Sequence, residues 1–391
     1  MTTPPDPPPD DTVAGAVERY LEAKAKGQGT GNYRSLAASA LGRWQNWLAD
    51  QDITLLEDVT DEEMRRYAQS LRRAVRDDDL AASTAQTYYA TSRACLAWCV
   101  QDGRYNLVEN PAAASRATSE LPEDTAEPTR QFWRPEDVQT IRAYVGRRAH
   151  DAVEEHGLQG ARPALRDRAL VSLLAAAGVR GAEVFRDTDD DRDGRQGLPW
   201  RRVDLDAGTL TVLGKSQNWE HAQLPEQACD HLRRYSEAQD PPNRGWPVFP
   251  TAHGPSKYRA VREQLSDRDW NEQEIEDVLG ENPIGEVLRE HDVVPPAITV
   301  RGARSVMQRL CDEADLDVEG GYLKPHGARR GLGDALYRES AELAQSALRH
   351  ASVRTTHDAY SHIDASKTAD EVGSILNDVW ENENDNVTRT N

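Results

Sequence analysis

Several residues in the predicted second domain have types and positions suited to chemistry. Arg180 lies at a predicted junction between two helices, where a guanidinium can project into a cleft. Lys215 lies at the tip of a predicted hairpin, and its ammonium is suited to proton donation. His326 and Arg329 are three residues apart in a predicted helix, so they share one helical face.

A further stretch carries His350 and, ten residues later, Tyr360. Ser352 and Thr355 lie between His350 and Tyr360 and are typical of turns and helix caps. They predict that this stretch forms two short helical pieces. Taken singly, all of these residues have plainer explanations. An arginine at a helix boundary usually pairs at the surface, hairpin tips are polar, helix N-termini carry solvated charges, and a lone tyrosine usually packs.

Local signals predict the elements that position these residues. An apolar helix should end at Gly178, the next should begin near Gly181, and Pro325 should start a third. Between them, apolar residues and turn signals predict an antiparallel β-meander. Its strands are predicted at Val203–Leu205, Thr209–Leu213 and His221–Leu224, joined by turns at residues 206–208 and 214–218.

The first half of the sequence is predicted to be a compact all-α domain of four helices. Capping boxes should open the third helix at Thr60 and the fourth at Ser83, and Gly103 should end the fourth. The predicted organisation is a disordered N-terminus (1–10), a helical domain (11–115), a linker (116–131), a second domain (132–380) and a flexible tail (381–391).

The composition excludes some classes of protein. The 391 residues predict two domains. The longest mostly apolar run, residues 169–179, is too short for a membrane span, which needs about 20 residues. No secretory signal is expected, because the first residues lack a basic and an apolar region. Four scattered cysteines are expected to be buried thiols in a reducing cytoplasm.

The charge is strongly acidic, with Asp plus Glu 67, Lys plus Arg 47 and a formal net charge of −20. Arginine outnumbers lysine 41 to 6. Such a surface is expected in molar salt, where screening over about 3 Å weakens self-repulsion. A GC-rich genome would also favour arginine, so this alternative stays open. The acidity argues against a general nucleic-acid coat, but six basic residues outnumber four acidic ones between Gly321 and His362.

Taken together and in order, the motifs resemble those of the tyrosine recombinase, or phage integrase, family. They are GVRGAE at 178–183, the hairpin Lys215, PHGAR at 325–329, and His350 followed by Tyr360. The resemblance runs from about residue 11 to 380. It implies a mainly α fold with a small antiparallel β-meander, made of a helical core-binding (SAM-like) DNA-binding domain and an α+β catalytic domain.

The resemblance implies a site-specific recombinase that cuts and rejoins DNA through a 3′-phosphotyrosyl intermediate, without metal or cofactor. It assigns the attack on the phosphate to the tyrosine, oxygen binding to the two arginines and protonation of the departing 5′-oxygen to the lysine. The histidines would handle the tyrosine proton and hydrogen-bond the phosphate. The implied catalytic set is Arg180, Lys215, His326, Arg329, His350 and Tyr360.

Two neighbours of the catalytic set are also singled out. Glu183 is expected to orient Arg180, one helical turn before it. Arg349 stands where the family usually has glycine, and the added arginine is expected to contact the phosphate.

The segment from 186 to 195 is an acidic insertion that resembles the start of a calcium loop. Asp189, Asp191 and Asp193 have the right spacing, but Trp200 stands where the bidentate glutamate should be. A solvated, salt-adapted loop without a metal is therefore expected, and a calcium site is the alternative.

The implied partners are double-stranded DNA and further copies of the chain, as a dimer on one site and a tetramer in synapsis, with no membrane. The family type expected from the acidic composition is haloarchaeal or haloviral. The alternatives are a catalytically silent DNA-binding relative, a type IB topoisomerase-like enzyme that relaxes DNA, and an acidic helical interaction protein whose motifs are coincidental.

Overall fold

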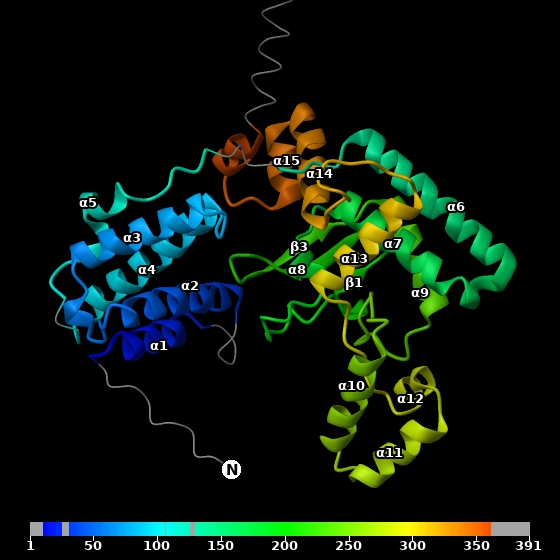
Figure 1. Cartoon of the computed structure of the whole chain (residues 1–391). Coiled ribbons are helices and arrows are strands. Elements are labelled where there is room, and N and C mark those ends of the chain that lie inside the picture. Colours follow the sequence, from blue (N-terminus) through cyan, green and yellow to red (C-terminus); the bar gives the residue numbers. More distant parts are fainter. Residues whose placement is uncertain (1–10, 26–30, 106, 126–129, 361–391) are drawn as a thin grey trace, which may run out of the picture. The chain divides into compact units, whose positions relative to one another are not determined.

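The structure is a computed structural model in which helices dominate and one small antiparallel sheet is present (Figure 1). This architecture confirms the predicted fold class. The predicted terminal segments, 1–10 and 381–391, lie outside the described residues. The structure describes residues 11–25, 31–105, 107–125 and 130–360.

The described residues fall into two compact units. The first unit comprises the described residues up to 125 together with Asp189–Arg192, and the second comprises 130–188 and 193–360. No helix in these described ranges combines the length and the apolar character needed to cross a membrane.

In the first unit, four long helices pack around an aromatic core. Tyr20, Trp44, Tyr67 and Tyr89 are almost completely buried, and the rings of Tyr67 and Tyr89 stack with centroids 6.4 Å apart. All four predicted helices are present. The elements are α1 (Val13–Lys24), α2 (Asn32–Ala49), η1 (Leu56–Asp58), α3 (Asp61–Arg76), α4 (Ala82–Asp102), η2 (Pro111–Ala113) and α5 (Ser115–Thr118).

Of the three predicted end signals in this unit, Gly103 is confirmed, and Thr60 caps α3 but without the reciprocal capping box that was predicted. The Thr60 hydroxyl accepts the Glu62 backbone N–H at 3.3 Å, so it caps α3, and Gly103 ends α4 in the left-handed region with φ 72°. The capping box predicted at Ser83 is wrong. Helix α4 begins at Ala82 without a side-chain cap, because alanine readily joins a helix and leaves the serine inside the first turn.

The second unit is built around α7, whose apolar residues are buried on nearly every side and against which α6, α9 and α14 pack. The helices of this unit are α6 (Pro135–Gly160), α7 (Arg162–Ala177), α8 (Gly181–Val184), η3 (Trp200–Arg202), α9 (Glu226–Gln239), α10 (Gly254–Ser266), α11 (Glu272–Glu281), α12 (Ile284–Glu290), α13 (Val300–Glu313), α14 (Pro325–Glu339) and α15 (Ala341–Leu348). Residues 353–360 are also helical.

A buried carboxylate ties three of these helices together. Asp167 on α7 has no exposed surface, and Arg166, Arg148 on α6 and Arg309 on α13 pair with it at 2.7, 2.7 and 2.6 Å. A buried carboxylate is costly unless it is paired, so these arginines hold α6 and α13 against α7.

The predicted meander forms one sheet in the order β1 (Val203–Asp204), β2 (Thr209–Leu213) and β3 (Trp219–Gln223). Leu210 pairs with Val203 on one side and with Ala222 on the other, and all three are buried against the core of the unit. The third strand begins at Trp219, two residues earlier than predicted, because Trp219 pairs with Leu213 and the turn needs only the residues between them.

Candidate active site

Arg329 joins the ends of three helices in the second unit. It lies one turn inside α14, which starts at Pro325 as predicted, and only 4 % of it is exposed. Its guanidinium donates to the carbonyls of Gly178, at the end of α7, and Leu348, at the end of α15. Helix C-termini leave carbonyls without helical partners and carry partial negative charge, so they hold the cation without a carboxylate.

Gly178 is required at this junction for two reasons. It ends α7, as predicted, in the left-handed region with φ 59°, where side chains are strained. A Cβ atom there would also lie 3.2 Å from the Ala347 carbonyl oxygen. The glycine therefore lets the end of α7 approach α15 closely enough for Arg329 to reach both.

Arg180 and Glu183 form the start of the short helix α8. The carboxylate of Glu183 accepts the backbone N–H of Arg180 at 2.8 Å and, through its other oxygen, a guanidinium N–H of Arg180 at 2.8 Å. Glu183 is 2 % exposed, whereas the Arg180 side chain keeps 28 % of its surface exposed. The buried acid therefore fixes a cation that still faces outward, the role predicted for it.

Arg349 shares the carboxylate of Glu183. Its Nη2 donates to Glu183 at 2.6 Å and its Nε donates to Glu220 on β3 at 3.1 Å. Its side chain is 8 % exposed, and its Nη1 has no hydrogen-bond partner among the described residues. Two carboxylates thus hold the arginine that was predicted to contact a phosphate, and they link the end of α15 to both α8 and the sheet.

The hairpin that carries Lys215 is fixed at its base. Arg195, itself buried, donates to the carbonyl of Ala182 on α8 at 3.1 Å and to the carbonyl of Gly214 at 2.9 Å. Lys215 follows directly and is exposed. Within the described part of the chain its ammonium makes no hydrogen bond or ion pair, so the structure does not bring it into contact with the other five predicted residues.

The two histidines of the set have lowered pKa values. Loss of water and the guanidinium groups of Arg329, Arg180 and Arg349 lower the pKa of His350 to about 4. His350 is held by a hydrogen bond of 2.9 Å between its Nδ1 and the Thr356 hydroxyl. His326 lies in the first turn of α14, and loss of water and nearby arginines lower its pKa as well. Both histidines are therefore neutral near pH 7.

Thr356 lies inside a continuous helix over residues 353–360, so the prediction of two short pieces between His350 and Tyr360 is wrong. The Ser352 hydroxyl accepts the Thr355 backbone N–H at 3.3 Å and caps this helix. The Thr356 hydroxyl bonds to His350, and Thr356 does not interrupt the helix.

Tyr360 is buried in a small apolar cluster. It is 3 % exposed, and its ring packs against the rings of Tyr337 and Phe132 with centroids 5.7 and 6.5 Å away. Its hydroxyl lies against Gly333 of α14, where a Cβ atom would come within 1.9 Å of the phenol oxygen. Burial raises the pKa of Tyr360, although Arg329 opposes the shift, so the phenol is protonated at neutral pH.

Electrostatic interactions connect five of the six predicted residues. Arg180 and Arg329 both act on His326 and His350, and Arg329 also acts on Tyr360. Burial and the neighbouring cation of Arg180 lower the pKa of Arg329 to about 10. Positive charge is therefore concentrated at one place and only partly balanced by Glu183, an arrangement that favours binding of an oxyanion.

The acidic insertion is less solvated than predicted. Asp187 and Arg195 are buried, and the backbone N–H of Asp187 donates to the carbonyl of Arg195 at 2.8 Å. Asp193 pairs with Arg202 at 2.5 Å. Over the described ranges, no three acidic, histidine or cysteine side chains gather as a metal site requires.

Two supporting residues were missed at the level of sequence. Glu220 is a charged residue in a short strand, and Arg195 lies at the end of an acidic run, so neither position carries a local signal of its role. Their functions depend on partners 129 and 19 residues away along the chain, Arg349 and Gly214.

The sequence and fold were compared with known proteins. The model of the phage integrase family matches residues 148–367, which is more than half of the chain. The chain belongs to the phage integrase family. Curated relatives include the tyrosine recombinases XerC of Xylella fastidiosa, 29 % identical over 187 residues, and of Xanthomonas campestris pv. campestris, 26 % identical over 238 residues. These matches cover 48 % and 58 % of this chain and 53 % and 60 % of the relatives' length.

Solved phage integrase and recombinase structures share the fold. The Tn1549 transposon integrase in complex with transposon right end DNA has a TM-score of 0.59 at 13 % identity, covering 93 % of this chain and 99 % of that one. The XerH site-specific recombinase bound to a palindromic difH substrate has a TM-score of 0.53 at 14 % identity, covering 88 % and 80 %. At these identities the likeness establishes the fold alone.

A double-mutant cycle on Arg349 and Glu220 tests the buried link between α15 and the sheet. We expect Arg349→Met and Glu220→Gln to couple by about 1–3 kcal/mol in urea unfolding, because the pair is largely buried. The control cycle is the exposed pair Arg233 and Asp230, which lie 2.8 Å apart and should couple by less than about 1 kcal/mol. Equal couplings would contradict a structural role for the buried pair.

The lowered pKa of His350 predicts acid sensitivity. The unfolded chain takes up this proton near pH 6.5, whereas the folded chain does so only near pH 4. The unfolded state therefore binds more protons in this window, and the free energy of unfolding falls as the pH drops through it. We expect His350→Asn to lose less stability than wild type between pH 7 and 4.5. Identical curves for His350→Asn and wild type would refute the assignment.

Proposed function

We propose that this chain is a site-specific DNA recombinase that cuts and rejoins DNA through a covalent 3′-phosphotyrosyl intermediate. The observation that carries the proposal is the cluster of Arg180, Arg329 and His350 beside Tyr360, in a chain of the phage integrase family. A partly uncompensated group of cations next to a phenol suits a reaction in which a phosphate is bound and attacked by that phenol.

In the proposed reaction, the phenol oxygen of Tyr360 forms a bond to the scissile phosphorus and the bond to the 5′-oxygen breaks. Arg180 and Arg329 bind the non-bridging oxygens and stabilise the charge that develops on them. Lys215 delivers a proton to the departing 5′-oxygen, and a free 5′-hydroxyl leaves. A second strand's 5′-hydroxyl reverses the step, since the phosphodiester energy is conserved in the tyrosyl link.

The neutral histidines fit this scheme as hydrogen-bonding groups. His326 would take up or share the phenol proton, and His350 would hydrogen-bond a phosphate oxygen or steer Tyr360. A bound phosphate would raise the pKa of both histidines, because it counters the guanidinium charges that lower them.

The described conformation represents a resting state in this proposal. The Tyr360 hydroxyl must leave the contact with Gly333, and the exposed Lys215 must approach the phosphate. Lys215 lies at a hairpin tip, where movement is feasible. DNA binding would supply the free energy for the change by favouring the assembled site.

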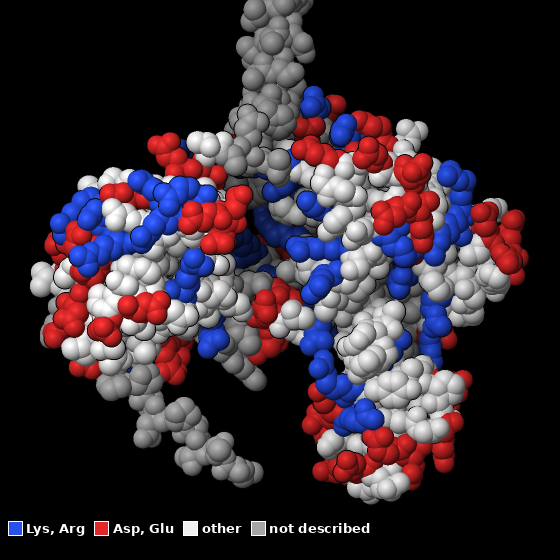
Figure 2. Space-filling view, viewed as in Figure 1, with Lys and Arg blue, Asp and Glu red and all other residues white. Residues whose placement is uncertain are grey.

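The proposed partner is double-stranded DNA, bound by both parts of the chain. Residues 11–115 would form the core-binding domain, 116–131 the linker and 132–380 the catalytic domain. Positive side chains gather in places on this acidic surface (Figure 2), and α3 alone carries Arg65, Arg66, Arg72, Arg73 and Arg76. A related structure contains a lambda integrase dimer bound to a core site. We extend this to a dimer on each site and a tetramer in synapsis.

A suicide-substrate assay tests the reaction. Nicked duplexes from the gene's own flanks should trap wild type as a protease-sensitive covalent adduct, and Tyr360→Phe should give none. Lys215→Ala should bind normally but form adduct at least about 100-fold more slowly, as expected for loss of a general acid. Tyr258→Phe, on α10, is the matched control and should react as wild type.

The same assay separates the alternatives. A catalytically silent relative would bind DNA and form no adduct. A type IB topoisomerase-like enzyme would relax any supercoiled plasmid without site preference. An adduct that persists in Tyr360→Phe would refute the assignment of the nucleophile.

We further propose a haloarchaeal or haloviral protein that acts in a salt-rich cytoplasm. The net charge of −20 and the scarcity of lysine support this. Counterion release contributes little to DNA affinity in molar salt, so binding would rely on shape and base-edge contacts. We expect specific binding to its own site to decline only slightly between 0.2 and 2 M KCl. Loss of specific binding above ordinary salt concentrations would refute the adaptation to high salt but would leave the recombinase assignment unaffected.

A further inference from the structure

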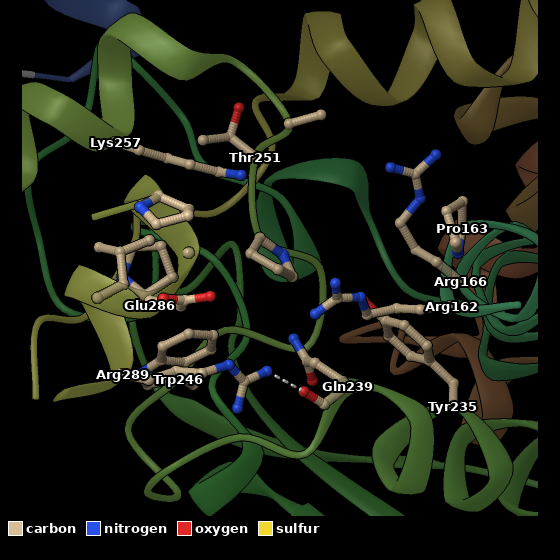
Figure 3. Close-up of a pocket in the computed structure, with 16 residues that line it drawn as sticks. Arg162, Pro163, Arg166, Tyr235, Gln239, Trp246, Thr251, Lys257, Glu286 and Arg289 are labelled. Atoms are coloured by element: carbon tan, nitrogen blue, oxygen red, sulfur yellow. Dashed lines mark hydrogen bonds between the residues drawn. The ribbon is translucent and has the colours of Figure 1, made fainter. Parts of the chain in front are cut away.

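A second concave site lies in the second unit, apart from the catalytic set. It is a pocket of about 480 Å³ between the start of α7 and the helices α10 and α12 (Figure 3). None of the six predicted catalytic residues lines it. Helix α7 runs from Arg162 in this pocket to Ala177, just before the catalytic junction at Gly178, and its 16 residues span about 24 Å.

The pocket is positively charged in a chain that is strongly acidic. Four cations line it, Arg162, Arg166, Lys257 and Arg289, against one carboxylate, the exposed Glu286. Such a local reversal of sign in a concave site attracts anions, because the low-dielectric walls focus the field.

Two of the four cations are already engaged by the protein. Arg166 pairs with the buried Asp167, and Arg289 donates to the backbone carbonyls of Gln239 and Asp240 while its guanidinium lies 5.3 Å from the centre of the Trp246 ring. These arginines hold the walls of the pocket in place.

The other two cations have no partner among the residues that the structure describes. Arg162 and Lys257 make no side-chain hydrogen bond or ion pair with any described residue, and Figure 3 shows them extending from opposite sides into the pocket. Loss of water and the nearby charge of Arg162 lower the pKa of Lys257. Arg162 and Lys257 are therefore near enough to repel each other, and no anionic side chain among the described residues neutralises either of them.

The N-terminal end of α7 lies at the same wall, and its positive dipole end adds to the positive potential of the pocket.

We propose that this pocket binds a small phosphate-bearing ligand through Arg162 and Lys257. The two cations come from separate elements, α7 and α10, and extend into the pocket from opposite sides (Figure 3). A phosphate group carries a charge of about −1.5 to −2 at neutral pH, so it can compensate both cations at once, whereas a carboxylate carries only one negative charge. The volume lies in the range of small-molecule sites, and the position at the far end of α7 separates the ligand from DNA held at the catalytic residues.

Calorimetric titration of the full-length chain with pyrophosphate, in phosphate-free buffer at constant KCl, tests the proposal. Wild type should bind, and the double variant Arg162→Gln/Lys257→Gln should bind at least 10-fold more weakly. Arg259→Gln is the matched control. Arg259 lies on α10, two residues after Lys257, but it does not line this pocket and pairs with Glu263 at 3.7 Å. It should bind as wild type does.

A parallel titration with duplex DNA identifies the source of the phosphate. Unchanged DNA affinity in the double variant, together with lost pyrophosphate binding, supports a free phosphorylated ligand. Absence of pyrophosphate binding to wild type, or equal binding by the double variant, would overturn the proposal, as would a variant that loses affinity for DNA alone. Because no readout depends on strand cleavage, failure here is distinguishable from failure of the recombinase function.

Discussion

The arrangement of the candidate active site depends on one buried carboxylate. Glu183 accepts from both Arg180 and Arg349, and a carboxylate in such a place requires compensation because water cannot reach it. Through these two bonds the start of α8, the end of α15 and, by way of Glu220, the strand β3 are held in one geometry. Removing the acid would release two cations at once and leave their mutual repulsion unopposed.

The local parts of this structure were predictable from sequence and the long-range parts were not. Gly178, Gly103 and Pro325 mark helix ends because their backbone preferences act within a few residues. The roles of Glu220 and Arg195 escaped notice because each depends on a partner in another element. The burial of Tyr360 was equally hidden, since a tyrosine on an amphipathic helix has the same pattern whether it packs or reacts.

The net charge of −20 does not reveal how charge is distributed within the second unit. Arg329 is held by carbonyl groups alone, so its charge is not cancelled, and its pKa falls to about 10 beside Arg180. Fixed dipoles and ions of this kind need little reorganisation when an oxyanion arrives. A local concentration of positive charge around Arg329 therefore exists in a chain whose net charge is −20.

Gly333 gives the phenol of Tyr360 a place to rest that no other amino acid would provide. Any side chain there would occupy the space of the hydroxyl, so the missing Cβ atom of Gly333 leaves room for the Tyr360 phenol to pack against α14. In the proposed recombinase, the phenol could attack DNA only after leaving this contact, so cleavage outside the target site would be disfavoured. The identity of one small residue would thereby limit unintended damage to the genome.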